Sequence, residues 1–263
     1  AFTIARVKNT EYLRTWERSK QAFGVDFMVC TNLLAAESIA RMLSLPAARD
    51  VDPFADGKVE MAEFEVGEDS PVANLTVAEA DRFESLTFVA VLRNGSVEVA
   101  RGETVISSGD RVVVIGSPES VHGFADSVAL EEASDDTEEV VVVGGSEIGY
   151  HVARLLEERG FRPRLIEQDG DRARELAEQL PNTVVLESDA TDRGFLEREH
   201  VGEADVVVSA LESDERNLLA CLLAKRVGAA RAISVVDSYD FLDVFEAVGV
   251  DVAVSPRPVV AEC

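Results

Sequence analysis

A run of four valines that leads into a glycine-rich turn restricts the possible folds of this chain more than any other feature. Val140–Val143 are followed at once by Gly144-Gly145-Ser146-Glu147-Ile148-Gly149. Four β-branched residues in succession favour a strand buried on both faces, as in a parallel sheet. Apolar residues recur with helical spacing from Tyr150 to Arg159, so a helix follows the turn. The free N–H groups and positive dipole end at the start of such a helix suit a phosphate.

A carboxylate also stands where a nucleotide site needs one. Glu167 ends the predicted strand Arg164–Ile166, close to the roughly 20 residues that separate the glycine turn from the ribose-binding acid in a dinucleotide fold. Ser146 departs from the Gly-x-Gly-x-x-Gly pattern, because the glycine expected there lets the pyrophosphate approach closely. We therefore predict a nucleotide site in which Ser146 weakens binding. The alternative is a turn of a parallel sheet that holds no ligand.

The stretch from residue 140 to the end alternates strands with helices, which predicts a doubly wound parallel sheet of the Rossmann type. The expected strands are Val140–Val143, Arg164–Ile166, Thr183–Leu186, Asp205–Ala210, Arg231–Val236 and Val252–Val254. The expected helices are Tyr150–Arg159, Asp171–Leu180 and Ser213–Val227.

The first 45 residues resemble the end of the same unit. Phe23–Val29 aligns with Val248–Val254, and Ile4–Val7 aligns with Ile233–Val236. We expect the chain to begin inside the fifth strand of a repeated unit, as a piece of a longer tandem protein.

Residues 57–130, between these two parts, predict a small α+β domain. Its expected strands are Val59–Val66, Leu86–Arg93, Val97–Ala100 and Arg111–Ile115, with helices beginning near Thr76 and at Pro118. Asn94-Gly95 is typical of a hairpin turn. The acidic segments at residues 50–56 and 131–139 are expected to be linkers.

The charge balance excludes some partners. The chain has 50 Asp and Glu against 25 Lys and Arg, a formal net charge of −25, and the acids are dispersed along it. Such a surface argues against nucleic acid or anionic lipid as direct partners, and it is typical of proteins from salt-accumulating organisms. Cys30, Cys221 and Cys263 are far apart and are expected to be free thiols in a reducing cytosol. No apolar run reaches the roughly 20 residues of a membrane span.

We find no catalytic or metal-binding set. His122, His151 and His200 are scattered and are expected to be exposed bystanders, although Glu147 and His151 share a helix face. Ser209 lies outside a Gly-x-Ser-x-Gly turn. No tyrosine has a lysine four residues later.

The chain resembles the TrkA family, the cytoplasmic nucleotide-gated subunits of potassium uptake systems, which are built from RCK (TrkA-N) and TrkA-C domains. The matching motifs are Gly144–Gly149, Leu165–Asp169, Leu186–Asp192, Glu212–Asn217, Val254–Arg257 and Arg6–Tyr12, together with Ser108-Gly109-Asp110 before an apolar strand. The resemblance covers essentially the whole chain. It implies the C-terminal part of a first RCK domain at residues 1–50, a TrkA-C domain at 57–130 and a nearly complete second RCK domain at 139–263.

The resemblance also implies roles for particular residues. Phosphates would lie on the turn formed by Gly144, Gly145, Ser146, Glu147, Ile148 and Gly149. Glu167 would bind the adenosine ribose, which favours NAD(H), while ATP and ADP stay open as ligands. Asp189, Ala190 and Thr191 would flank the adenine, and Leu211 and Glu212 would lie near the other half of the ligand. Arg6 matches a basic residue that approaches the nucleotide of the first unit, whose glycine turn is absent here. The alternative to ligand contact for Asp189 and Asp192 is that they are a helix cap and a solvated acid.

Two functions follow. In the favoured one, the protein is a non-enzymatic cytoplasmic regulator: a nucleotide shifts the RCK conformation, which is transmitted to a membrane potassium transporter subunit. The alternative is an NAD-dependent oxidoreductase on the same scaffold. The apolar helix expected at residues 31–45 corresponds to a crossover helix that packs on a second subunit in the family. We therefore expect a homodimer formed through residues 1–45.

Overall fold

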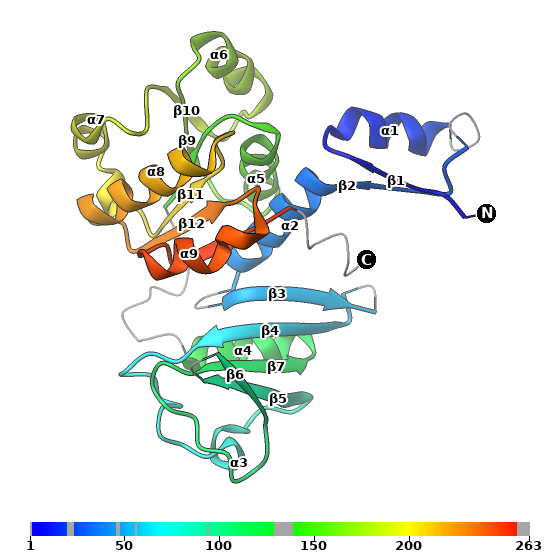
Figure 1. Ribbon diagram of the computed structural model, residues 1–263, viewed down its shortest axis with the longest axis vertical. Helices are drawn as coiled ribbons and strands as arrows, with labels where there is room; N and C mark the ends of the chain where they lie inside the picture. The colour runs from blue at the N-terminus through cyan, green and yellow to red at the C-terminus, as the bar shows by residue number, and fades with distance from the viewer. Residues whose placement is uncertain are drawn as a thin grey trace. The chain divides into compact units, whose positions relative to one another are not determined.

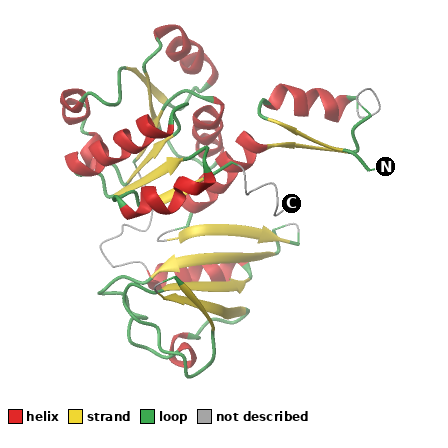
Figure 2. Ribbon diagram, viewed as in Figure 1, coloured by secondary structure: helices red, strands yellow, loops and turns green. Residues whose placement is uncertain are grey.

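The computed structural model describes residues 2–19, 24–45, 48–55, 57–93, 95–128 and 139–256. The chain divides into two compact units. The larger unit combines Ala1–Ala40 with Glu138–Cys263, and the smaller unit is Arg41–Thr137. Figures 1 and 2 show the elements of both units.

A six-stranded sheet in which every neighbouring pair is parallel forms the centre of the larger unit, as the sequence predicts. Its strands are β8 (Val140–Val143), β9 (Arg164–Glu167), β10 (Val184–Glu187), β11 (Val206–Ser209), β12 (Arg231–Val235) and β13 (Val252–Val254). The order across the sheet is β10-β9-β8-β11-β12-β13. The chain therefore reverses its direction of progress between β8 and β11, and ligands bind at this kind of switch point, beyond the carboxyl ends of the strands.

All but the last of the helices between these strands begin at a polar cap. The helices are α5 (Glu147–Glu158), α6 (Gly170–Gln179), α7 (Arg193–Arg198), α8 (Asp214–Val227) and α9 (Leu242–Ala247). Ser146, Asp169, Asp192 and Ser213 each accept a hydrogen bond from a backbone N–H group in the first turn of the helix that follows, which satisfies donors that a helix otherwise leaves unpaired.

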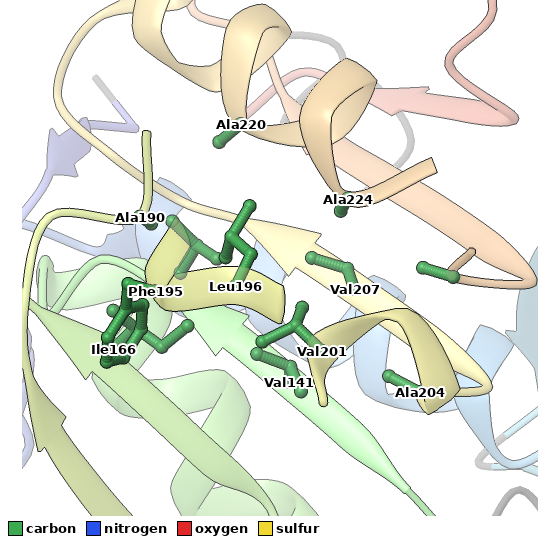
Figure 3. Packing of buried hydrophobic residues seen from close by; sticks show 12 residues of the cluster. Val141, Ile166, Ala190, Phe195, Leu196, Val201, Ala204, Val207, Ala220 and Ala224 are labelled. Carbon is green, nitrogen blue, oxygen red and sulfur yellow. The ribbon is translucent and has the colours of Figure 1, made fainter. Parts of the chain in front are cut away.

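The core on one face of this sheet consists of small and branched apolar side chains. Val141 and Val143 of β8 belong to the same buried cluster as Phe195 of α7 and Ala220 of α8 (Figure 3). Because successive side chains of a strand point to opposite faces, Val142 faces the other way, toward α5. All four valines are buried, as expected for a central parallel strand.

The N-terminal residues repeat the end of the larger sheet in three dimensions. β1 (Ile4–Val7) and β2 (Phe27–Cys30) form a two-stranded parallel sheet in which Ile4 lies beside Phe27. In the larger sheet Ile233 lies beside Val252, and these are the residues with which Ile4 and Phe27 align. The same register in both pairs supports the internal repeat. Helix α1 (Thr10–Arg18) contributes the buried Trp16, whose indole N–H donates to the carbonyl of Val25 at 2.8 Å.

The apolar helix after β2 differs from the expected exposed surface. In α2 (Thr31–Leu43), Ile39, Met42 and Leu43 are almost completely buried, and only Leu33 and Leu34 keep partial exposure. The argument that this helix needs a second subunit to cover it is therefore wrong for most of its apolar residues. The dimer itself stays a prediction.

The smaller unit is the expected α+β domain. Its strands are β3 (Ala48–Phe54), β4 (Val59–Glu65), β5 (Leu86–Arg93), β6 (Ser96–Val99) and β7 (Arg111–Gly116), and its helices are α3 (Val77–Ala80) and α4 (Pro118–Val128). The antiparallel sheet has the order β3-β4-β7-β5-β6. Phe124 of α4 lies edge-on to the rings of Phe64, Phe83 and Phe88.

One expected linker is a strand. Residues 50–54 belong to β3, which pairs with β4 along its whole length. The misassignment has a physical origin: Pro53 lacks a backbone N–H, which argues against a strand, but β3 is at the edge of the sheet, where proline is tolerated. Asn94 of the expected hairpin turn and residues 131–138 of the other expected linker lie outside the described residues.

Candidate functional site

In the glycine turn after β8, backbone atoms exclude a side chain at two positions, and neighbouring side chains crowd a third. Gly144 has a φ of +98°, and a Cβ atom there would lie 2.9 Å from the carbonyl oxygen of Ala210. A Cβ on Gly149 would lie 1.9 Å from the carbonyl oxygen of Gly144, and one on Gly145 would lie 2.7 Å from a carboxylate oxygen of Glu167. The turn therefore brings the start of α5 against the end of β8, as in a phosphate-binding turn.

Ser146, which replaces the middle glycine of the motif, has an ordinary backbone conformation with a φ of −61°. Its hydroxyl donates to the carbonyl of Ala210 at 2.6 Å and accepts from the N–H of Gly149 at 3.3 Å. The hydroxyl is thus engaged with the protein. The backbone N–H groups of Glu147 and Ile148 donate to no acceptor within the described part of the chain, and such groups at a helix start bind anions.

Glu167 reaches the turn from the end of β9. One carboxylate oxygen accepts from the N–H of Gly145 at 2.6 Å, and the other accepts from the N–H of Asp169 at 2.7 Å. Arg172 of α6 completes this arrangement by donating from Nε to the carbonyl of Gly145 at 2.9 Å. A carboxylate oxygen can accept more than one hydrogen bond, so Glu167 can bind ribose hydroxyls while it holds the turn.

Beyond β10, the predicted adenine-flanking residues form a local turn. The N–H and the hydroxyl of Thr191 both donate to Asp189, at 2.9 and 2.7 Å. These bonds, with a smaller contribution from the Arg216 guanidinium, lower the pKa of Asp189. Ala190 is buried in the core cluster, so a ligand could meet only its backbone. Asp192 caps α7, which agrees with the helix-cap alternative.

Arg216, which was not among the predicted site residues, connects the loops after β9 and β10. Its guanidinium donates to the side-chain oxygen of Gln168 at 2.8 Å and lies 3.6 Å from Asp189. The sequence could have indicated Arg216 by its position in the first turn of α8, directly after the strand-end segment Leu211–Ser213. A helix that begins there must direct its first turn toward the carboxyl edge of the sheet.

On the β11 side of the turn lies a cavity of about 270 Å³. It is lined by Lys8, Asn32, Ser146, Glu147, Ile148, Leu211, Glu212, Asp214, Asn217, Val235, Asp237 and Pro256. Leu211 and Glu212 thus line one cavity, and their place beside the other half of a ligand stays a prediction. Arg6 is not in this lining, whereas Lys8, two residues later, is. The repeat could have indicated Lys8, because it aligns with Asp237, which lines the same cavity.

Asn217 gives the cavity a rigid wall. Its buried side-chain oxygen accepts from the Ser209 hydroxyl at 2.8 Å and from the N–H of Leu211 at 2.7 Å. Its amide nitrogen donates to the carbonyls of Leu211 at 3.0 Å and Val235 at 2.9 Å. All four hydrogen-bonding positions of the amide are used, and they join the ends of β11 and β12 to α8.

The expectation of exposed histidines is wrong for His151. Its ring is 1 % exposed, and neither ring nitrogen has a hydrogen-bond partner in the described structure. Burial, with smaller contributions from Arg154 and Arg14, lowers its pKa to about 4. The sequence misleads here because the three histidines are scattered with no motif around them, while the helix turns His151 itself toward the core.

Other sequence expectations about chemistry can be compared with the structure. Cys30 and Cys221 are buried free thiols, and burial raises the pKa of Cys221 to about 12; Cys263 lies outside the described residues. The described ranges contain no cluster of three or more metal-ligating side chains. They also contain no helix long and apolar enough to cross a membrane.

The switch point, the glycine turn and the acid at the end of β9 define the larger unit as an α/β domain of the dinucleotide-binding class. Comparison with known families is more specific. Residues 140–256 match the TrkA-N domain, and residues 61–129 match the TrkA-C domain. The chain thus contains the two domains expected from its resemblance to the TrkA family.

Similar curated proteins carry potassium-uptake names. The Trk system potassium uptake protein trkA homolog 1 of Methanosarcina mazei is 38 % identical over 97 % of this chain and 63 % of that protein. The Trk system potassium uptake protein TrkA homolog of Archaeoglobus fulgidus is 36 % identical over 97 % of this chain and 58 % of that protein. The chain thus spans somewhat more than half the length of these relatives.

Solved structures show the same fold. The GsuK RCK domain superposes with a TM-score of 0.70 at 20 % identity, over 100 % of this chain and 55 % of that one. The GsuK channel bound to NAD superposes with a TM-score of 0.68 at 21 % identity, over 100 % of this chain and 46 % of that one.

Proposed function

We propose that the larger unit binds an adenine nucleotide, preferably NAD(H), and that binding regulates a membrane potassium transporter without chemical turnover. The observation that carries this proposal is the pair of free N–H groups at the start of α5, next to a turn that is tied to Glu167. Phosphates would lie on residues 144–148, and the adenosine ribose would lie at Glu167. A related fold is named as a channel bound to NAD, which supports the choice of ligand.

The relatives support the proposed partner and location. Curated members with matching domains are named potassium uptake proteins, so the protein would act in the cytoplasm on a membrane potassium transporter subunit. The same names favour a regulatory role over an oxidoreductase.

Calorimetric titration in molar potassium chloride tests the proposal. NAD⁺, NADH, ADP and ATP are titrated into the wild type, Glu167→Gln and Glu178→Gln. Glu167→Gln keeps an oxygen that can accept from Gly145 but loses the charge that strengthens ribose bonds, so we expect a loss of about 1.5–3 kcal/mol in binding free energy. Glu178 is exposed on α6 and serves as the control.

Two results would reject the proposal. Saturable binding of no adenine nucleotide at millimolar concentration would mean that the turn is structural only. Turnover of bound NADH, seen as loss of the reduced nicotinamide absorbance with a small carbonyl substrate, would favour the oxidoreductase. For the regulatory step, potassium uptake by cells that carry the full-length protein should lose its nucleotide dependence with Glu167→Gln.

A further inference from the structure

A single arginine connects the two loops that flank the proposed adenosine end of the nucleotide. Arg216 belongs to the first turn of α8, and its Nη2 atom donates to the side-chain oxygen of Gln168 at 2.8 Å. The same atom lies 3.6 Å from a carboxylate oxygen of Asp189. Gln168 directly follows β9, and Asp189 lies two residues beyond β10, which is a neighbour of β9 in the sheet. Arg216 thus bridges both loops from a third element.

The backbone that carries Arg216 is held in place by hydrogen bonds. Its N–H group donates to the Ser213 hydroxyl at 3.3 Å, and this bond caps α8. The next residue, Asn217, is buried, and its amide joins α8 to the ends of β11 and β12. The guanidinium therefore extends from a fixed point of the fold toward the two loops. A side chain that is supported in this way can hold its partners in a binding arrangement.

Each partner of the guanidinium is itself connected to a predicted ligand-binding residue. Gln168 lies between Glu167, the proposed ribose-binding acid, and Asp169, whose N–H donates to the Glu167 carboxylate at 2.7 Å. On the other loop, Asp189 accepts two hydrogen bonds from Thr191, one of the predicted adenine-flanking residues. Restraint of Gln168 and Asp189 therefore restrains the groups that would bind the ribose and flank the base.

We propose that Arg216 is a positioning residue for the adenosine end of the ligand. This inference rests on the proposed function, because it concerns the same site. Loops that are already ordered bind a ligand more tightly, because the ligand need not supply the free energy that orders them. The planar guanidinium fixes the directions of both N–H donors of Nη2, so one atom can hold Gln168 and face Asp189 at the same time.

Calorimetric titration of ADP, ATP and NAD⁺ in molar potassium chloride tests the inference. Arg216→Ala should weaken each ligand that the wild type binds by a similar factor, about threefold to tenfold, because these ligands share the adenosine end. Arg216→Lys should recover only part of the affinity, since an ammonium group on a flexible stem lacks the planar geometry. Arg174→Ala removes an exposed arginine of α6 from its pair with Asp171. It is the matched control and should leave the affinities unchanged.

A double-substitution cycle tests whether Arg216 acts through Gln168. If it does, Gln168→Ala should weaken binding on its own, and it should add less than about twofold to the loss in Arg216→Ala. The urea midpoints of the single variants should match that of Arg174→Ala, because partly exposed ion pairs contribute little to stability.

The outcomes separate this inference from the proposed function. Wild-type binding that Arg216→Ala leaves unchanged would overturn the inference and leave the nucleotide site intact. Full recovery in Arg216→Lys, a loss that grows from ADP to ATP, or additive losses in the double variant would also overturn it. A lower urea midpoint in Arg216→Ala would attribute the loss to the fold and overturn it as well. Failure of the wild type to bind any of these ligands would reject the proposed function, and the inference with it.

Discussion

At the scale of single residues, Ser146 shows how a departure from a motif can be accommodated. Its backbone conformation is accessible to any residue, and its hydroxyl holds both the start of α5 and the end of β11. Serine therefore contributes to stability at a position where glycine would serve the ligand better. The two roles are separable by experiment.

Ser146→Gly should destabilise the larger unit and improve nucleotide binding. Loss of the cap and of the bond to Ala210 should cost about 0.5–2 kcal/mol in the free energy of unfolding. Removal of the Cβ should allow a closer phosphate and raise the affinity severalfold. Urea denaturation and calorimetry measure the two effects. Thr76→Gly, which removes a cap from the smaller unit, should leave affinity unchanged; weaker binding by Ser146→Gly would contradict the prediction.

His151 makes the larger unit sensitive to acid. Its pKa is about 4 in the folded chain and about 6.5 in an unfolded one. A depressed pKa means that the unfolded chain takes up the proton first. The neutral ring therefore favours folding fully above pH 6.5, and this contribution is lost as the pH falls from about 6.5 to 4. The total loss would be about 3 kcal/mol.

We predict that His151→Leu reduces the dependence of the free energy of unfolding on pH. Free energies of unfolding between pH 7 and 4, from urea titrations, should fall less steeply in this variant than in the wild type. His200→Asn is the control, because His200 is exposed with a φ of 53°, a conformation that asparagine tolerates. Equal slopes in wild type and His151→Leu would show that the ring is not the group that titrates.

At the scale of elements, the small β1–β2 sheet presents an exposed apolar surface. Phe2 is 74 %, Ile4 is 64 % and Phe27 is 42 % exposed, and Ile4 and Phe27 are neighbours across the two strands. Adjacent exposed apolar side chains of this kind mark association surfaces. These exposed residues, and not the buried helix α2, are now the basis for expecting a dimer.

We expect a dimer in high salt that depends on this sheet. Ile4→Asp combined with Phe27→Asp should shift the mass found by light scattering from twice the chain mass of 28.4 kDa to that mass. Val97→Asp, at an equally exposed valine of β6 in the smaller unit, should have no such effect. A wild-type monomer, or a dimer that survives the double substitution, would place the association elsewhere or exclude it.

At the scale of the whole molecule, the negative net charge determines how stability depends on salt. The chain carries 25 excess negative charges, and the described ion pairs are mostly partly exposed, such as Arg174–Asp171 and Arg193–Glu197. Exposed pairs of this kind add little stability. The repulsion among the remaining carboxylates must therefore be screened by salt.

We predict that tertiary structure requires high salt. The Debye length is about 30 Å at 0.01 M and about 3 Å at 1 M, so repulsion acts across a whole unit only at low salt. Near-UV circular dichroism should be lost on dialysis from molar to low potassium chloride and should return on its restoration. Sucrose at the same osmolarity should not replace potassium chloride in maintaining this signal. A signal that stays flat from about 0.05 to 3 M would refute the expectation of a salt-adapted protein.

Much of the fold follows from local sequence patterns. The valine runs, the glycine turn and the caps at Ser213 and near Thr76 place strands and helices within one to three residues of where they lie, because each signal involves neighbours in the chain. Short helices such as α7 received no predicted bounds, and the edge strand β3 was read as a linker, since their local patterns are weak and packing decides them. The position of Glu167 beside Gly145 was expected from the fold class, and its two hydrogen bonds were not.

The sequence by itself therefore determined the α/β class, the repeat and the acid at the turn, because periodicity and turn chemistry are local properties. Only the tertiary structure decided the burial of His151, the use of the Ser146 hydroxyl and the joining of Lys8 with Glu212 and Asp237 around one cavity. These residues lie far apart in the chain or on a helix face whose environment no local pattern reveals. Their proximity results from how the strands are ordered in the sheet, and that order depends on long-range packing.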